Sequence, residues 1–134
     1  MNLRPGKQWM LRQKSSDSVK LISLNQNEVL AALVEIAERI RKDHPDVSSI
    51  RVFGSIARGD HVGTSDVDVL IILNRDIHTL TDRLAQIRRF YPYFDLPIGV
   101  DLLVYTQDEI DRRLDAGDAF ITRIWRESRL LSPS

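Results

Sequence analysis

The chain has 134 residues, of which 43% are hydrophobic, and its 19 basic and 19 acidic residues give a formal net charge of zero. This length suits one domain with one core, and the balanced charge argues against a general nucleic-acid binder. The absence of cysteine excludes disulfides, thiolate metal sites and a cysteine nucleophile. The sequence shows neither a signal-peptide core nor an apolar run long enough to span a membrane, so we expect a cytoplasmic protein.

The N-terminal part of the chain combines a polar segment with a periodic one. Residues 1–18 are rich in Lys, Arg, Gln and Ser, and we predict a flexible tail there, followed by a single domain over residues 19–134. From Asn27 to Lys42 the apolar side chains recur at helical spacing, which predicts an amphipathic helix. Asn25 and Glu28 have the spacing of a capping box that starts such a helix.

Two strands separated by a loop are predicted next. The helix should end at His44, because the residue before a proline is disfavoured in helical conformation, and we expect His44 to be a solvated loop residue. The apolar run Ser48–Phe53 predicts a strand. A loop over residues 54–63 follows, with one helical turn expected at 55–58. Val67–Leu73 is apolar on both faces, which predicts a strand inside the sheet.

The second half of the chain continues this alternation. Apolar spacing and a threonine cap predict a helix over Thr79–Phe90, and a turn-rich segment follows it. The run Ile98–Tyr105 predicts the third strand. A capping box that begins at Thr106 opens a helix to about Leu114.

The last predicted helix runs from Ala119 to about Glu127, and Leu130-Leu131 follows as a short strand. Its apolar stripe consists of Phe120, Ile121, Ile124 and Trp125. Such a stripe usually covers a sheet, and we favour that interpretation over an interface with a partner. Strands separated by helices indicate the α/β class, with a small mixed sheet of three to four strands packed with helices.

Three aspartates interrupt the apolar strands, where charged residues are normally excluded. Asp66 and Asp68 flank the start of the second strand, and Asp101 lies in the third. Because strand side chains alternate between faces, Asp66 and Asp68 should project from one face about 7 Å apart. Carboxylates held this closely repel each other unless one is protonated or a cation lies between them. Oxygen ligands at this density favour Mg²⁺ or Mn²⁺ over zinc.

A phosphate-binding turn precedes these aspartates. Gly54 permits a close backbone approach, and the amides and hydroxyl at Gly54-Ser55 can hold phosphate oxygens. Arg58 is placed either to neutralise a triphosphate or to form an ion pair with Asp60 or with one of the three aspartates. A phosphate-binding turn beside metal-binding carboxylates predicts phosphoryl or nucleotidyl transfer by in-line displacement.

Two other nucleotide-binding motifs are disfavoured. Gly54 and Gly59 have the spacing of a P-loop, but Asp60 stands where that motif needs lysine. The G-x-G-x-x-G motif of dinucleotide-binding folds is absent from the sequence.

The whole pattern resembles the polymerase-β-type nucleotidyltransferase superfamily, and more narrowly the minimal nucleotidyltransferases of bacteria and archaea. It consists of Gly54-Ser55, ten intervening residues, Asp66-Val67-Asp68 and the later Val100-Asp101-Leu102, within a similarity over roughly residues 24–131. The resemblance implies the nucleotidyltransferase fold, Mg²⁺ (or Mn²⁺) as cofactor and ATP as substrate. It also implies catalytic and metal roles for Asp66, Asp68 and Asp101, and a nucleotide-binding set of Gly54, Ser55, Arg58 and Ser65.

The resemblance also implies a partner. Members of this family are often paired with a small helical protein of the HEPN type, and some pairs act as toxin and antitoxin. In such pairs the nucleotidyltransferase can move AMP from ATP onto a tyrosine of the toxin. We therefore expect a protein adenylyltransferase, with the acceptor or part of its pocket supplied by another chain, and a homo-oligomer is compatible with this expectation.

Two alternatives stay open at this stage. The chain could neutralise a toxin by forming a complex with it, without catalysis. It could instead transfer a nucleotide to a small molecule such as an aminoglycoside, although the sequence gives no sign of a substrate domain.

Overall fold

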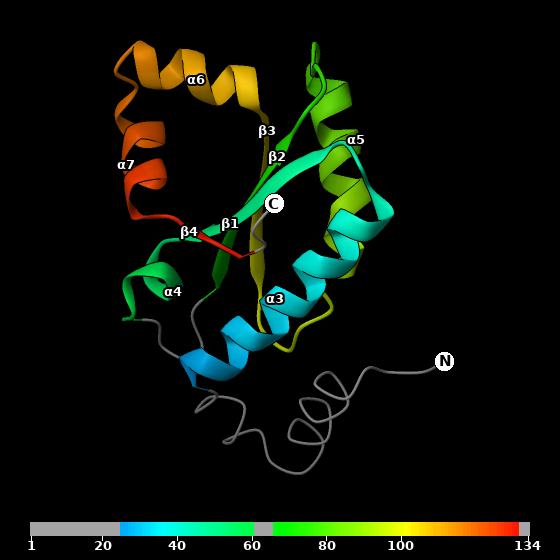
Figure 1. The fold of residues 1–134 in the computed structure, drawn as a ribbon, viewed down its shortest axis with the longest axis vertical. Coiled ribbons are helices and arrows are strands. Elements are labelled where there is room, and N and C mark those ends of the chain that lie inside the picture. The colour runs from blue at the N-terminus through cyan, green and yellow to red at the C-terminus, as the bar shows by residue number, and fades with distance from the viewer. Residues whose placement is uncertain (1–24, 61–65, 132–134) are drawn as a thin grey trace.

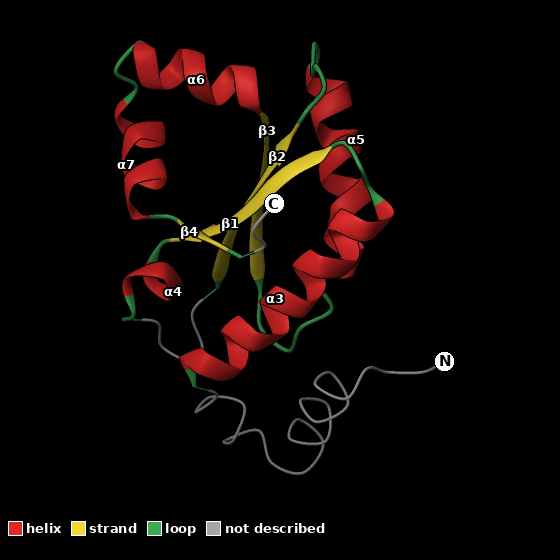
Figure 2. Ribbon diagram, viewed as in Figure 1, coloured by secondary structure: helices red, strands yellow, loops and turns green. Residues whose placement is uncertain are grey.

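The computed structural model describes residues 25–60 and 66–131, which form a mixed α/β fold (Figures 1 and 2). The predictions for residues 1–18 and for Ser65 lie outside the described residues. The order of elements is α3 (Gln26–Asp43), β1 (Val47–Phe53), α4 (Ser55–Arg58), β2 (Val67–Leu73), α5 (Leu80–Phe90), η1 (Tyr91–Tyr93), β3 (Val100–Thr106), α6 (Gln107–Asp115), α7 (Ala119–Glu127) and β4 (Arg129–Leu130).

The strands form one four-stranded sheet in the order β3-β2-β1-β4. β1 pairs antiparallel with β2 and with β4, whereas β2 and β3 are parallel. Strand β2 thus lies inside the sheet, as its largely apolar sequence predicts. The fold class predicted from the sequence, a small mixed sheet packed with helices, is confirmed.

Helices cover both faces of the sheet, and each face has its own apolar cluster (Figure 2). One face packs against α3 and α5 and receives Val67, Val69 and Ile71 from β2. The opposite face packs against α6 and α7 and receives Leu70 and Ile72. Because neighbouring side chains of a strand point to opposite faces, the positions of Asp66 and Asp68 belong with Leu70 and Ile72.

The helix ends follow the predicted capping chemistry. Asn25 and Glu28 form a capping box at α3, and Thr106 and Glu109 form one at α6. The Thr79 hydroxyl accepts a hydrogen bond from the Asp82 amide at the start of α5. The structure of the described residues contains no helix that is both long and apolar enough to cross a membrane.

The third strand begins later than its apolar run predicts. The sequence places its start at Ile98, whereas β3 begins at Val100. The difference follows from pairing, because β2 begins at Val67, which lies opposite Val100. The Val67 amide also donates to the Gly99 carbonyl over 2.9 Å, and this bond starts the ladder.

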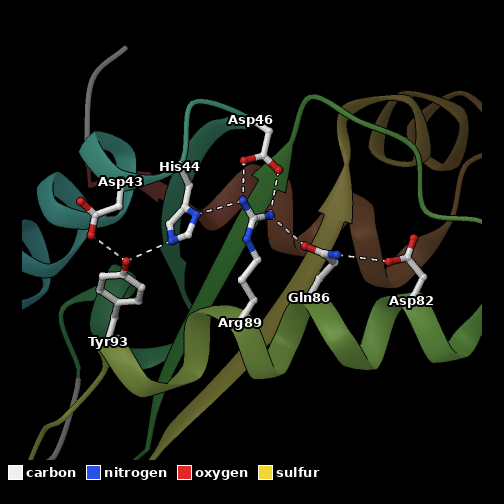
Figure 3. A network of polar contacts seen from close by, with 7 residues as sticks. All are labelled: Asp43, His44, Asp46, Asp82, Gln86, Arg89 and Tyr93. Atoms are coloured by element: carbon white, nitrogen blue, oxygen red, sulfur yellow. Dashed lines mark hydrogen bonds and ion pairs between the residues drawn. The ribbon is translucent and has the colours of Figure 1, made fainter.

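A polar network joins the end of α3 to α5 (Figure 3). The guanidinium of Arg89 holds the Asp46 carboxylate through two bonds of 2.7 and 2.8 Å, and it also donates to Gln86. These hydrogen bonds hold the pKa of the Asp46 carboxyl below its usual range, against the opposing effect of burial. The bidentate pair therefore fixes α5 against the connection that leads into β1.

His44 belongs to this network. It lies in the loop after α3, as predicted, but its side chain is half-buried and hydrogen-bonded rather than solvated. Its Nδ1 atom lies 2.9 Å from the Arg89 guanidinium, and its Nε2 atom lies 3.0 Å from the Tyr93 hydroxyl. Arginine can only donate, so Nδ1 must accept and the imidazole proton must lie on Nε2. The Tyr93 hydroxyl then donates to Asp43 over 2.7 Å. Spacing in the sequence could not show this, because Tyr93 and Arg89 are distant along the chain.

We expect Arg89→Lys to lower the free energy of unfolding by about 1–3 kcal/mol, because an ammonium cannot reproduce the bidentate contact. Arg88→Lys is the matched control, because Arg88 is next to Arg89 in the chain and its side chain is exposed. This substitution should change the free energy of unfolding by less than about 0.5 kcal/mol. Chemical denaturation at neutral pH measures both variants.

The same pair predicts a pH dependence. The pKa of the Asp46 carboxyl is lowered in the folded protein, so its contribution is present above the ordinary carboxyl pKa and is lost as pH falls below that value. The stability difference between wild type and Arg89→Lys should therefore narrow below about pH 4. A difference that stays constant down to pH 2.5 would contradict this role for the pair.

Candidate functional site

An open cleft of about 500 Å³ lies where β1 ends and where β2 and β3 begin. Figure 1 shows α4 and α7 beside this end of β1. Six of the seven residues predicted as site residues line it, namely Gly54, Ser55, Arg58, Asp66, Asp68 and Asp101. The seventh, Ser65, is outside the described residues. Residues from three separate parts of the chain therefore meet in one cleft.

The register of the sheet brings the aspartates together. In the parallel pair of β2 and β3, Asp68 lies directly opposite Asp101. Burial raises the pKa of the Asp68 carboxyl, and the charge of Asp101, a side-chain hydrogen bond with Asp101 and the charge of Asp66 raise it further. The positive charge of Arg58 opposes this rise. The three carboxylates therefore lie close enough to interact, and a cation between them would relieve their repulsion.

Two glycines provide the space for these carboxylates. Gly54 has φ 71° and ψ −151°, a conformation that strongly favours glycine, and a Cβ atom there would lie 2.2 Å from Asp68 Oδ2. A Cβ atom on Gly99 would lie 2.4 Å from Asp66 Oδ1. Sequence analysis predicted a role for Gly54 but not for Gly99, because the contact between Gly99 and Asp66 depends on the pairing of β2 with β3.

Arg58 is engaged in two ion pairs in this structure. Its guanidinium lies 3.3 Å from a carboxylate oxygen of Asp60 and 3.3 Å from one of Glu127. The pairing with Asp60 was one of the two interpretations of Arg58 from the sequence, and it is confirmed. Binding of a triphosphate by Arg58 stays a prediction, and it would require the guanidinium to exchange at least one of these partners.

Helix α7 contributes residues that sequence analysis did not assign to the site. Arg123, Ile124 and Glu127 line the cleft. Ile124 is buried against the sheet, as the interpretation of its stripe as a sheet cover predicts, whereas Phe120 of the same stripe is 47% exposed. Arg123 and Glu127 are one helical turn apart, a spacing that by itself indicates a solvated helix face. Their place in the cleft follows from the way α7 packs, which the local sequence does not show.

The donor set suits a hard cation. Mg²⁺ commonly binds through one or two carboxylates and completes its shell with water and substrate phosphates. The adjacent carboxylates of Asp68 and Asp101, with Asp66 beside them, match this chemistry. Within the described residues, no group of three or more His, Cys, Asp or Glu side chains is already arranged to hold a metal ion. Two carboxylates and a substrate would therefore have to complete the shell.

The contact between Gly54 and Asp68 can be tested with a double-mutant cycle. We expect Gly54→Ala to destabilise the protein by about 1–3 kcal/mol, through backbone strain and through the clash with the Asp68 carboxylate. In an Asp68→Ala background the clash is removed, so the loss should be smaller. Unfolding by denaturant measures all four proteins.

Gly59→Ala is the matched control for this cycle. Gly59 has φ 88°, but a Cβ atom there would come no closer than 3.9 Å to the nearest side chain. Its substitution should carry the backbone strain alone, with the same effect in either background. If Gly54→Ala lowers the free energy of unfolding equally with and without Asp68, the Asp68 carboxylate does not occupy the space beside Gly54.

Comparisons with known proteins agree with this geometry. Residues 33–132 match the model of the nucleotidyltransferase domain family. A provisionally assigned nucleotidyltransferase from Sulfolobus solfataricus has a similar structure, with 32% sequence identity, a TM-score of 0.52, and coverage of 65% of this chain and 75% of that one. Comparison with curated protein sequences finds no match.

Two solved toxin–antitoxin structures are also similar to the chain. One contains AMP-PNP, with 19% identity and a TM-score of 0.47, and the other is a mutant of the pair MntA–HpeT, with 17% identity and a TM-score of 0.45. Each alignment covers 83% of this chain and 75% of the other. At these TM-scores the two likenesses carry no argument about function. The family match over residues 33–132, which contains the cleft described above, establishes that the chain belongs to the nucleotidyltransferase domain family.

Proposed function

We propose that this chain is a Mg²⁺-dependent nucleotidyltransferase that moves AMP from ATP onto a hydroxyl group of a partner protein in the cytoplasm. The observation that carries the proposal is the single cleft that joins the Gly54-Ser55 turn to Asp66, Asp68 and Asp101 in a member of this family. The identity of the partner as a small HEPN-type toxin rests on the family resemblance of the sequence.

The reaction is an in-line displacement at the α-phosphorus of ATP. The acceptor oxygen forms a bond to phosphorus, the bond to the pyrophosphate oxygen breaks, and the acceptor hydroxyl loses its proton. Asp66 and Asp68 would hold Mg²⁺, or Mn²⁺ in its place, and Asp101 would hold a second ion or accept the hydroxyl proton. The bound metal supplies charge neutralisation and orientation of the phosphates.

The phosphates would be held beside these carboxylates. Gly54 and Ser55 offer backbone amides and a hydroxyl, and Ser65 belongs to the same proposed set. Arg123 is exposed and lines the cleft, and within the described part of the chain no hydrogen bond or ion pair engages its guanidinium. It therefore offers a positive charge that Arg58 can offer only after leaving a carboxylate partner.

The first test is a transfer assay with α-³²P-labelled ATP, Mg²⁺ and a lysate of the source cells. Wild type should label a protein band that the variant Asp66→Ala/Asp68→Ala fails to label, with activity reduced at least about 100-fold because the carboxylates act in the transition state. Mass spectrometry of the band identifies both the partner and the modified residue.

The assay distinguishes the proposal from its alternatives. A band of equal strength with the double variant would show that another protein in the lysate performs the transfer. No labelled protein, in a preparation that binds Mg²⁺-ATP, would overturn transfer to protein and favour a small-molecule acceptor or a binding role.

Mg²⁺ should also raise thermal stability, because it binds the folded state and relieves the repulsion among the carboxylates. At a free ion concentration about 100 times the dissociation constant, the gain would be about 2.7 kcal/mol. Asp66→Asn should reduce this gain, whereas Asp115→Asn, which changes an exposed carboxylate at the end of α6, should leave it intact. Melting curves with and without the ion measure the gain, and equal shifts in all three proteins would exclude Asp66 as a ligand.

A further inference from the structure

The carboxylate of Glu127 contacts both groups that a nucleotide phosphate would use. Its Oε1 atom accepts a hydrogen bond of 3.0 Å from the Gly54 amide. Its Oε2 atom lies 3.3 Å from the Arg58 guanidinium. These contacts join residues that are 73 and 69 positions apart in the chain, so they depend on the tertiary fold.

The position of Glu127 at the end of α7 is electrostatically unfavourable. It is the last residue of that helix, and the C-terminal end of a helix carries partial negative charge that disfavours a carboxylate. The side chain is only 22% exposed, so water offsets this effect in part. The contacts with Gly54 and Arg58 therefore hold the carboxylate in the cleft.

We propose that the Glu127 carboxylate occupies the position of a nucleotide phosphate in the cleft and must be displaced when a triphosphate binds. This inference rests on the proposed function, because it assigns the Gly54 amide and Arg58 to the phosphates of the substrate. It adds that the protein's own carboxylate competes for both of them.

The chemistry of the two anions explains the competition. Carboxylate and phosphate oxygens both accept hydrogen bonds from a backbone amide and from a guanidinium. The single N–H of Gly54 cannot serve both at full strength, and two anions side by side repel each other. Glu127 must therefore swing away, and Arg58 then becomes available to the phosphates. The free energy needed to break the contacts of Glu127 with Gly54 and Arg58 therefore weakens nucleotide binding by the same amount.

A different role for Glu127 predicts the opposite result. If Glu127 only positioned the Gly54 turn for binding, its removal would loosen the turn and weaken nucleotide binding. If it competes with phosphate, its removal strengthens binding. The sign of the change in affinity separates the two roles.

The test is calorimetric titration of the full chain with α,β-methylene ATP and Mg²⁺, since this analogue is not cleaved at the transferred phosphate. We expect Glu127→Gln to bind roughly tenfold more tightly than wild type, because a neutral amide accepts more weakly than a carboxylate. Glu127→Asp retains the charge but is one methylene shorter, and it should also bind more tightly because it cannot reach Gly54.

Asp60→Asn is the matched control. It removes the same charge from the same arginine, but within the described residues the Gly54 amide bonds to Glu127 and not to Asp60. The Asp60 side chain is also 63% exposed. We expect it to change affinity less than about twofold. If Asp60→Asn and Glu127→Gln gain affinity for the analogue equally, the loss of one negative charge alone would explain the effect. That result would overturn the proposal.

Two further outcomes are decisive. Unchanged or weaker binding by both Glu127 variants, in proteins with wild-type melting temperatures, would overturn the competition while leaving the proposed function intact. If wild type binds the analogue no more tightly than Asp66→Ala/Asp68→Ala does, the result would instead contradict the proposed function itself. Hydrogen exchange of the Gly54 amide gives an independent readout, because Glu127→Ala should speed it in the absence of nucleotide.

Discussion

The parallel register of β2 against β3 is the constraint on which the site depends. It sets Asp68 opposite Asp101, and the same pairing sets the apolar residues of both strands into two packed clusters. A slip of one residue would move the aspartates to the face covered by α3 and α5, and would turn the apolar side chains of the other face outward. The burial of β2 on both faces therefore fixes the position of the carboxylates as well as the core.

Holding these carboxylates together opposes folding, and other parts of the fold offset the effect. The raised pKa of the Asp68 carboxyl shows that its charged form is disfavoured where it lies. Gly54 and Gly99 leave room for the carboxylate oxygens, which larger residues would displace. The network around Arg89 fixes α3 to α5 at the end of β1 that lies away from the cleft. At about 3.3 Å per strand residue, the two ends of β1 are about 20 Å apart. The stabilising contacts of this network thus lie away from the cleft, whereas the carboxylates that disfavour folding lie within it.

The sequence predicts those features that local chemistry determines. Periodicity and caps identify the helices, and a charge within an apolar strand marks Asp68 and Asp101, since neither signal depends on distant contacts. Gly99, His44, Arg123 and Glu127 were missed or misjudged because their environments come from other elements. The hydrogen bond between Glu127 and Gly54, 73 residues apart, leaves no local trace in the sequence. Topology therefore has to be known before such residues can be interpreted.

Helix α7 belongs to the core and to the cleft at the same time, and this limits how the cleft can open. Ile121 and Ile124 pack on the sheet face that carries the aspartates, so their burial fixes the helix. Close to Glu127, the Arg51 guanidinium lies 4.2 Å from the centre of the Trp125 ring and donates to the Ser128 hydroxyl over 3.1 Å. Trp125 and Ser128, which lie on either side of Glu127 in the chain, are thereby attached to β1. If a nucleotide displaces the Glu127 carboxylate as we propose, the displacement would occur by rotation of the side chain on a fixed helix, without separation of α7 from the sheet.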